Sequence, residues 1–287
     1  MIISHKYKFI FLHARKCAGS SIQVALNKYL GPNDIQIGSW NETLSGNGKM
    51  NRKAIVDTFF STSSYSLFLK KFLASKLQNK KMYFSEFVNS SIKRCYQNKL
   101  GLNPDCPTAD LVMRFDPNSW KDYFKFSFVR NPFDFEISDY FWRTKEMTQK
   151  IDFKEFLKRK LKIKDDPENL VPVPSTNWPI YSINDKVVLD YIGVFEDLND
   201  HLSFISKRIG LPLDLHSLPK VKTGYKRQFN FRRRASRGSY ENPILRNGDL
   251  IVVGQSLVNV TNEVISEITA PFSSLFSTYA LIEALSD

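Results

Sequence analysis

The sequence lacks several features that would assign the chain to a common class. It contains no run of about eighteen apolar residues, so we expect no membrane-spanning helix. Its three cysteines, Cys17, Cys95 and Cys106, show no metal-ligand spacing and cannot all pair with one another. Because no export signal is evident, reduced thiols in the cytoplasm are the simplest interpretation. Internal repeats and low-complexity blocks are also absent.

The first residues do not follow the pattern of a signal peptide, although basic residues precede an apolar stretch. That stretch, residues 9–12, is short, and Arg15 and Lys16 follow it where a cleavage site needs small residues. We therefore interpret the stretch as a buried strand and expect a cytoplasmic protein.

The composition is that of a folded protein with an anionic partner. Hydrophobic residues make up 42% of the chain and aromatic residues 14%, with 23 phenylalanines, which is ample for a buried core. The net charge of +12 favours nucleic acid, a membrane surface or a polyphosphorylated small molecule as partner. A solvated basic surface is the alternative explanation of this charge.

Strands alternate with helices along most of the chain, which predicts one α/β domain over residues 1–287 with a central parallel sheet flanked by helices. The apolar patterns predict strands at 8–14, 123–130 and 186–196, and helices at 20–30, 132–141, 152–163 and 198–209. We expect residues 33–118 to form an acceptor-side insertion, with a loop at 38–51 and helices at 65–77 and 86–100. Further on, we expect a basic loop at 216–242 and helices at 255–268 and 272–285.

Two segments have the layout of a strand, a turn and a helix. In the first, Ser20 or Ser21 is the expected N-cap of the helix. In the second, Asn131 is the expected N-cap and Pro132 the first helical residue.

The first of these turns has the chemistry of an anion site. Gly19 permits a close approach of the backbone, the serine hydroxyls donate, and the dipole of the following helix favours negative charge. The turn is not a Walker A loop, because that motif has two glycines and places its lysine after the second, whereas Lys16 precedes Gly19.

The segment FIFLHARKCAGSSI resembles the 5′-phosphosulfate loop of sulfotransferases that use 3′-phosphoadenosine 5′-phosphosulfate (PAPS), usually written H-x-P-K-T-A-G-T-S. The resemblance is to the carbohydrate type, which includes heparan and chondroitin sulfotransferases, in a bacterial-type form. The residues on this pattern are His13, Lys16, Ala18, Gly19, Ser20 and Ser21. It implies a P-loop-like nucleotide-binding sulfotransferase fold.

Two later segments are similar to the same family. YFKFSFVRNPFDFEISDYFW resembles the 3′-phosphate segment F-V-R-N-P-x-D-R-x-x-S-x-Y, and residues 189–212 resemble a later strand and helix. The second pattern is met by Arg130, Asn131, Pro132, Asp134, Ser138 and Tyr140. The resemblance covers most of the chain and is weak over residues 33–118.

The resemblance implies a role for each matching residue. Lys16 would stabilise charge on the leaving phosphate, and Arg130 and Ser138 would hold the 3′-phosphate, for which the planar fork of arginine is suited. The product would be 3′-phosphoadenosine 5′-phosphate (PAP), and no metal is expected. The complete set of donor-binding candidates is Arg15, Lys16, Cys17, Ala18, Gly19, Ser20, Ser21, Arg130, Ser138, Arg234, Arg237 and Gly238.

The sequence departs from the family pattern at three places. Arg15 replaces the usual proline, Cys17 the usual threonine, and Phe135 the usual second arginine. The last change leaves the 3′-phosphate one charge short, and we expect a cation of residues 220–237 to supply it. Sulfotransferases of this class often close a basic loop over the donor, although a solvated loop or nucleic-acid binding would also explain that segment.

The acceptor must lose a proton, so a general base is expected. His13 is the best single candidate for this base. The alternative is that His13 is a core residue whose ring nitrogens are already hydrogen-bonded. The family's usual histidine is absent, because the comparable stretch reads Cys-Pro-Thr-Ala at residues 106–109. Weaker candidates are Asp105, Asp110, Glu86 and Glu136.

The sequence therefore predicts an enzyme that moves the sulfuryl group of PAPS to a hydroxyl or nitrogen by in-line displacement. The acceptor would be a saccharide or a small molecule, including a secondary metabolite or toxin. We expect neither nucleic acid nor a membrane as partner, and the oligomeric state is open. The alternatives are a basic nucleic-acid-binding protein and a P-loop-like nucleotide kinase, whose Walker lysine and magnesium ligands are missing.

Overall fold

In the computed structural model of the chain, residues 1–61 and 83–213 are described. The chain divides into two compact units, Met1–Pro219 and Lys220–Asp287, and all described residues belong to the first. The single domain over 1–287 therefore stays a prediction. The segments predicted at 65–77, 216–242, 255–268 and 272–285 lie outside the described residues, as do Arg234, Arg237 and Gly238.

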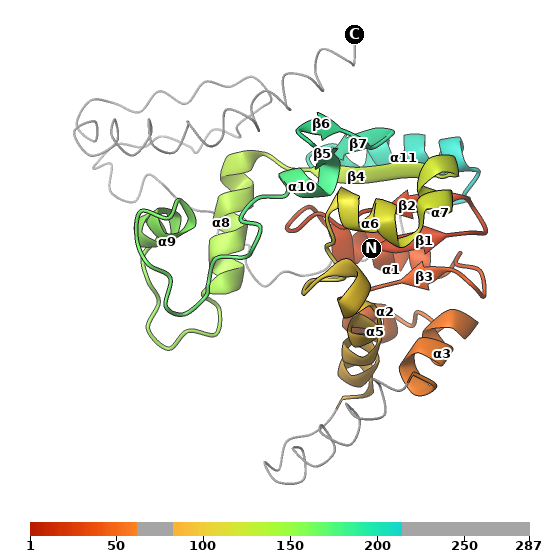
Figure 1. Ribbon diagram of the computed structural model, residues 1–287, viewed down its shortest axis with the longest axis horizontal. Coiled ribbons are helices and arrows are strands. Elements are labelled where there is room, and N and C mark those ends of the chain that lie inside the picture. Colours follow the sequence, from red (N-terminus) through yellow and green to blue (C-terminus); the bar gives the residue numbers. More distant parts are fainter. Residues whose placement is uncertain (62–82, 214–287) are drawn as a thin grey trace, which may run out of the picture. The chain divides into compact units, whose positions relative to one another are not determined.

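A five-stranded sheet with the order β3-β1-β2-β4-β7 forms the centre of the first unit (Figure 1). Its strands are β1 (Ile2–Ser4), β2 (Phe9–Phe11), β3 (Ile35–Gln36), β4 (Phe124–Val129) and β7 (Tyr191–Val194). Strands β2, β4 and β7 pair in parallel, whereas β1 pairs antiparallel with both β2 and β3. The prediction of a parallel sheet is thus wrong for the half that contains β1 and β3. The connection between β1 and β2 is too short for the crossover that parallel neighbours need.

The strand predicted at 186–196 is two strands. Its first residues form β6 (Lys186–Val187), which pairs antiparallel with β5 (Ser182–Ile183) outside the main sheet. Asn184 and Asp185 join them with φ angles of 50° and 58°, the left-handed conformation that a two-residue hairpin requires. Only Tyr191–Val194 enters the central sheet.

Helices surround the strands. Their bounds are α1 (Gly19–Asn27), α2 (Trp40–Ser45), α3 (Arg52–Phe59), α5 (Phe84–Leu100), α6 (Ala109–Phe115), α7 (Pro117–Asp122), α8 (Pro132–Arg143), α9 (Phe153–Lys160), α10 (Trp178–Tyr181) and α11 (Leu198–Ile209). The helices predicted at 86–100, 152–163 and 198–209 are confirmed by α5, α9 and α11. The loop predicted at 38–51 is wrong in part, because it contains α2, which buries Trp40 and its Nε1 hydrogen bond to the carbonyl of Gln36.

Helix α8 begins as predicted. The Asn131 side chain accepts hydrogen bonds from the N–H groups of Phe133 (3.0 Å) and Asp134 (3.5 Å), and Pro132 occupies the first turn. This cap satisfies N–H groups that the helix itself leaves free.

Phenylalanines fill the core beneath the parallel strands. Phe126 on β4 lies 5.7 Å from Phe9 and 5.2 Å from Phe11 of β2, measured between ring centroids. Full burial of each such side chain stabilises the fold by about 1.5–3 kcal/mol. The polar residues of β4 are also enclosed, and the Ser127 hydroxyl donates to the carbonyl of Leu12 at 2.7 Å.

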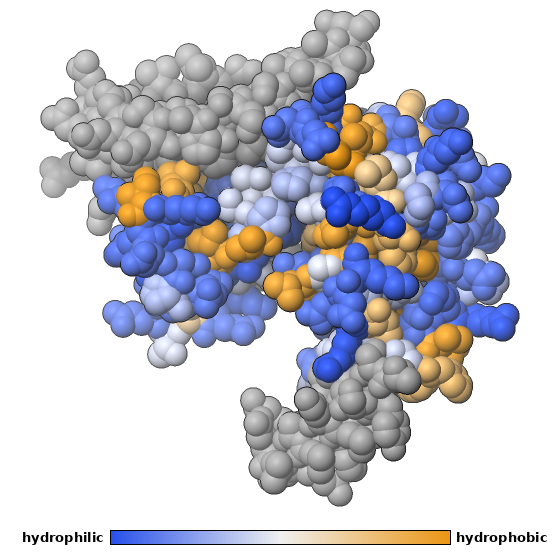
Figure 2. All heavy atoms as spheres, in the orientation of Figure 1, coloured by the Kyte–Doolittle hydropathy of each residue, from blue (hydrophilic) through white to orange (hydrophobic). Residues whose placement is uncertain are grey.

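The surface of the described part is mainly hydrophilic on the face that Figure 2 shows, with smaller hydrophobic patches between charged residues. Among the described helices, none is long and apolar enough to cross a membrane.

Gly193 offers a test of this packing. A Cβ there would lie 2.5 Å from Cε1 of the buried Phe128 and 3.0 Å from Cβ of His201 on α11. We expect Gly193→Ala to lower the free energy of unfolding by about 1–3 kcal/mol, as overpacking does, measured by urea denaturation. Gly210→Asn is the control, because no atom lies within 4 Å of its Cβ position and asparagine tolerates the left-handed conformation. Equal stability of Gly193→Ala and the parent would contradict the packing.

Candidate functional site

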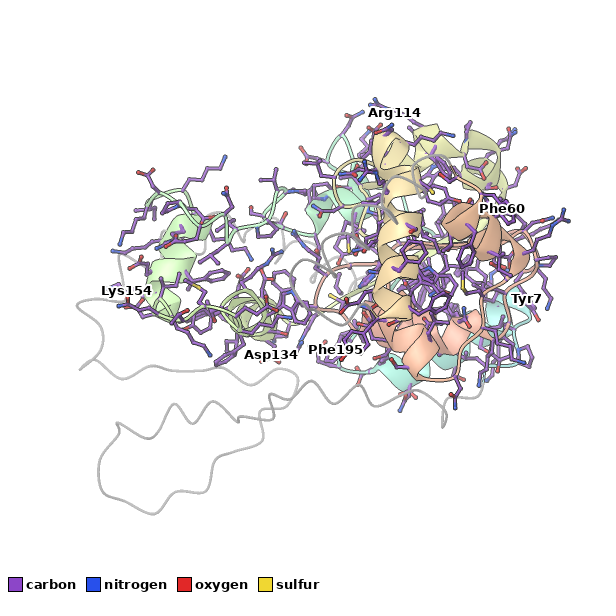
Figure 3. All side chains as sticks on the ribbon, turned by 90° about the horizontal axis from the view of Figure 1, so that it is seen from below. Tyr7, Phe60, Arg114, Asp134, Lys154 and Phe195 are labelled. Carbon is purple, nitrogen blue, oxygen red and sulfur yellow. The ribbon has the colours of Figure 1, made fainter. Side chains whose placement is uncertain are left out.

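The carboxyl ends of the three parallel strands meet at one edge of the sheet. The ladder continues past the strands, with Leu12 N–H donating to Phe126 O (3.0 Å) and Phe195 N–H to Val129 O (2.8 Å). The residues that follow β2, β4 and β7 are therefore neighbours, although they are far apart in sequence. In α/β sheets such an edge is where ligands bind. Figure 3 labels Phe195, which follows β7, and Asp134, in the first turn of α8.

Residues 15–18, here called the Lys16 loop, connect β2 to α1. Lys16 (φ 61°) and Ala18 (φ 57°) are left-handed and alternate with Cys17, which is not. This alternation turns successive N–H groups to one side, as in the nests that bind anions. The first hydrogen bond of α1 runs from Ile22 N–H to Ala18 O (3.1 Å). Helix geometry consequently leaves the N–H groups of residues 19–21 without intrahelical acceptors, directed out of the helix end.

The start of α1 corrects one prediction. Neither serine is the N-cap, because the helix begins at Gly19 with Ala18 as its cap and without a side-chain capping bond. Ser20 and Ser21 instead lie in the first turn, where both can contribute N–H groups to an anion. The Ser20 hydroxyl accepts a hydrogen bond from Ser39 at 3.0 Å.

His13 packs directly against Gly19. A Cβ at position 19 would lie 1.8 Å from Cδ2 and 2.1 Å from Nε2 of the imidazole, so only glycine fits here. The ring also stacks on Phe11, and its Nδ1 lies 3.3 Å from Nε2 of Gln23. Burial, together with the nearby amino terminus, lowers the pKa of His13 to about 3. Such an imidazole takes up a proton poorly near neutral pH, so this geometry favours the core interpretation over the base.

Lys16 lies next to α8. Its Nζ is 4.8 Å from the centroid of the half-exposed Trp142 ring, a cation–π contact. Burial lowers the pKa of Lys16 to about 8, the Arg130 and Arg143 guanidinium groups add to this effect, and the Asp139 carboxylate opposes it. Lys16 therefore carries its charge near neutral pH and loses it at a lower pH than an ordinary lysine.

Arg130, after β4, is held against the Lys16 loop. Its Nη1 donates to the carbonyl of Lys16 at 3.2 Å, and its guanidinium carbon lies 4.4 Å from the ring centroid of Phe195. Its Nε is buried and has no hydrogen-bond partner among the described residues. A buried donor of this kind calls for an acceptor, and an anion at the strand ends would supply one.

Ser138 lies on α8 one turn before Trp142. Residues four apart share a face of a helix, and Lys16 lies over Trp142 on that face. The structure thus brings Arg130 to the Lys16 loop and places Lys16 over Trp142, one turn from Ser138 on α8.

The side chains of Arg15 and Cys17 have other partners. The Arg15 guanidinium donates to the carbonyls of Pro174 (2.7 Å) and Thr176 (3.0 Å), and to Oδ1 of Asn177 (3.3 Å). The Cys17 thiol is buried, which raises its pKa to about 12, and it donates to the carbonyl of Arg15. Their predicted place in the donor site therefore rests on their backbone groups.

Asn177 is a site residue that the sequence does not reveal. Its side chain accepts from Arg15 N–H (3.3 Å) and donates to Arg15 O (2.9 Å), and so fastens the Lys16 loop. In the sequence it stands in a stretch marked only by prolines, without any local signal of this contact.

Most of the alternative bases are engaged in ion pairs. Glu136 pairs with Lys160 at 2.7 Å, Asp105 with Lys93 at 2.7 Å, and Asp110 with Arg114 at 2.7 Å. Burial raises the pKa of Glu136 despite its lysine. The fourth candidate, Glu86, lies in the first turn of α5. The base is therefore not identified by this geometry.

Among residues 1–61 and 83–213, no group of three or more His, Cys, Asp or Glu side chains could hold a metal ion.

Comparison with known proteins identifies the family. The model of the sulfotransferase family matches residues 1–247. The chain belongs to the sulfotransferase family. This confirms the family and transfer of a sulfuryl group in general, whereas the carbohydrate type stays a prediction. The α/β sheet accords with a sulfotransferase fold.

A relative from Archaeoglobus fulgidus, named only "Uncharacterized protein", is 32% identical over 97 residues, which cover 32% of this sulfotransferase and 72% of the relative. No solved structure matches the chain.

The contact of His13 with Gly19 can be tested by paired substitutions. Gly19→Ala should lower the free energy of unfolding by about 1–3 kcal/mol or more, since the new methyl group overlaps the imidazole. His13→Ala removes the obstacle, so the double variant should be more stable than Gly19→Ala alone in urea denaturation. Additive losses in the two single variants and the pair would contradict the contact.

Proposed function

We propose that this sulfotransferase takes its sulfuryl group from PAPS and moves it to a hydroxyl or nitrogen of a small-molecule or saccharide acceptor. The observation that carries the proposal is that two groups suited to bind anions follow neighbouring parallel strands. The Lys16 loop at the start of α1 is one, and Arg130 with its unpartnered Nε is the other. The hydrogen bond from Arg130 to Lys16 O joins them.

Each part of the site would hold one part of the donor. The N–H groups of residues 19–21 would bind the 5′-phosphate, together with the backbone of residues 15–18. Arg130 and Ser138 would bind the 3′-phosphate, the group that distinguishes PAPS from common nucleotides. PAPS supplies an activated sulfuryl group, whose bond to the bridging phosphate oxygen breaks as its bond to the acceptor forms, with PAP and a proton as the other products.

Lys16 has the chemistry to stabilise charge on the leaving phosphate. Its ammonium lies over the Trp142 ring of α8 and is protonated near pH 7. A fixed cation at the point where charge develops lowers the barrier of the reaction. The surrounding guanidinium groups of Arg130 and Arg143 add positive potential that suits a donor with several negative charges.

Position 135, where the family pattern has its second arginine, offers no cation of its own. Phe135 is buried, and Nζ of Lys160 lies 4.7 Å from its ring centroid. Residues 220–237, which we expect to supply the compensating cation, lie outside the described residues. The P-loop-like detail of the fold and a cytoplasmic location likewise stay predictions.

The first test is the identity of the donor. Arg130→Ala should weaken binding of PAP about 10- to 100-fold, the loss expected for charge-assisted hydrogen bonds, and should weaken binding of adenosine 5′-phosphate much less. Isothermal titration with both nucleotides measures this. Lys121→Ala, an exposed cation on α7, is the control. Equal losses for both nucleotides would place the 3′-phosphate elsewhere, and no affinity of the parent protein for PAP would refute PAPS as donor.

The second test is the pH dependence of turnover. Because Lys16 is active in its charged form and its pKa is about 8, kcat/KM for PAPS should fall as the pH rises through about 8. An ordinary lysine would place this fall above pH 10. Lys16→Arg stays charged throughout, so its remaining activity should lose this alkaline limb. A limb that is the same in Lys16→Arg would remove Lys16 as its cause.

A further inference from the structure

Asp139 is a buried carboxylate on α8 to which the proposed donor site gives no task. Its side chain is 1% exposed and lies between two cations. It is 3.4 Å from Nε of Arg143 and 3.4 Å from Nζ of Lys160. Burial of a carboxylate is costly unless neighbouring cations or hydrogen bonds compensate it.

The same turn of α8 reaches the Lys16 loop. Trp142 follows Asp139 by three residues, and the Nζ atom of Lys16 lies 4.8 Å from the centroid of the Trp142 ring. Residues three apart are neighbours on a helix, so the carboxylate lies one helical turn from the ring that the Lys16 ammonium contacts. Among the charges around Lys16 and Arg15, Asp139 has the largest effect on both, and it raises the pKa of each against the lowering effect of burial.

The other charges around Lys16 act in the opposite direction or have their own partners. Arg130 and Arg143 both repel the charge of Lys16. The Cys17 thiol contributes little negative charge near pH 7, because burial raises its pKa to about 12.

Lys160 is not the main counter-ion of Asp139, because it pairs more closely with Glu136. Its Nζ lies closer to both oxygens of Glu136, at 2.7 and 2.9 Å, than to Asp139 at 3.4 Å. Glu136 therefore compensates Lys160, and Asp139 remains as a buried negative charge beside Arg143, one helical turn before Trp142.

We infer that Asp139 is a positioning residue that keeps Lys16 charged in the free enzyme, before a donor binds. The inference rests on the proposed function, in which the Lys16 ammonium stabilises the leaving phosphate. A bound donor brings negative charge of its own, which favours the charged lysine independently of Asp139. Asp139 thus acts on the free enzyme, so its loss should change the pH dependence of kcat/KM more than that of kcat.

Competitive acylation of the free enzyme measures the protonation of Lys16 without any reaction of PAPS. Only the neutral amine reacts with acetic anhydride, so the labelling of Lys16 against pH, read by peptide mass spectrometry, gives its midpoint. We expect a midpoint near 8 for the parent. Asp139→Asn should move it about one pH unit lower, the effect of removing a nearby opposite charge. Asp139→Glu should restore it, and the exposed Asp165→Asn is the matched control.

The alkaline limb of kcat/KM for PAPS should move by the same amount in Asp139→Asn, with a smaller change in the limb of kcat. If Asp139→Asn does not fold, as judged by circular dichroism, Asp139→Ser removes the carboxylate, leaves the pair of Lys160 with Glu136 intact and should show the same lower midpoint. A labelling midpoint unchanged by the loss of Asp139 overturns the inference. A lower midpoint in a protein that does not bind PAPS keeps the charge effect and refutes the donor instead.

Discussion

The parallel pairing of β2 with β4 is the constraint on which the site depends. Phe9 and Phe11 pair with Phe124 and Phe126, and the Ser127 hydroxyl adds a bond across the same strands. Because parallel strands end at the same edge, the Lys16 loop and Arg130 meet there although 114 residues separate Lys16 and Arg130. The buried phenylalanine rings fix this register, so the core and the site share one origin.

Positive charge then makes the carboxyl edge of the parallel strands favourable for an anion. At the Lys16 loop, a helix N-terminus without a side-chain cap lies near several cations. The carboxylate of Asp139 compensates the positive charge of these cations only in part. Such an arrangement costs stability in the free protein and is relieved by a polyanion, which is the general condition for tight anion binding. The Asp139 carboxylate reduces the free-energy cost of keeping Lys16 charged. The surplus of positive charge is otherwise left for the donor.

Local signals in the sequence were sufficient for the two strand–turn–helix units. An apolar strand, a left-handed or glycine-containing turn and the Asn-Pro cap each act through neighbouring residues, so pattern alone locates Lys16 and Arg130. The antiparallel half of the sheet was missed because β1 and β3 are only three and two residues long. Helix α2 was missed because its Gly- and Ser-rich surroundings resemble a loop, whereas burial of Trp40 determines its structure.

The partners that complete the site could not be predicted in this way. Asn177 and Trp142 contact the Lys16 loop only through the tertiary fold, which also brings the charge of Asp139 close enough to act on Lys16. Nothing in the sequence around these three residues marks them. The same reason explains Arg15 and Cys17, whose side chains the fold directs away from solvent or toward residues 174–177. For His13, the sequence leaves a base and a core residue as alternatives, and the packing against Gly19 is visible only in the fold.

The central claim is that one bisphosphate nucleotide binds the loops after β2 and β4 together. Hydrogen–deuterium exchange of the full chain with and without PAP tests it most directly. The account predicts slower exchange on addition of PAP in both segments, residues 16–21 and residues 130–135, with adenosine 5′-phosphate protecting mainly the first. Protection in neither segment, or equal protection of the second by both nucleotides, would contradict it.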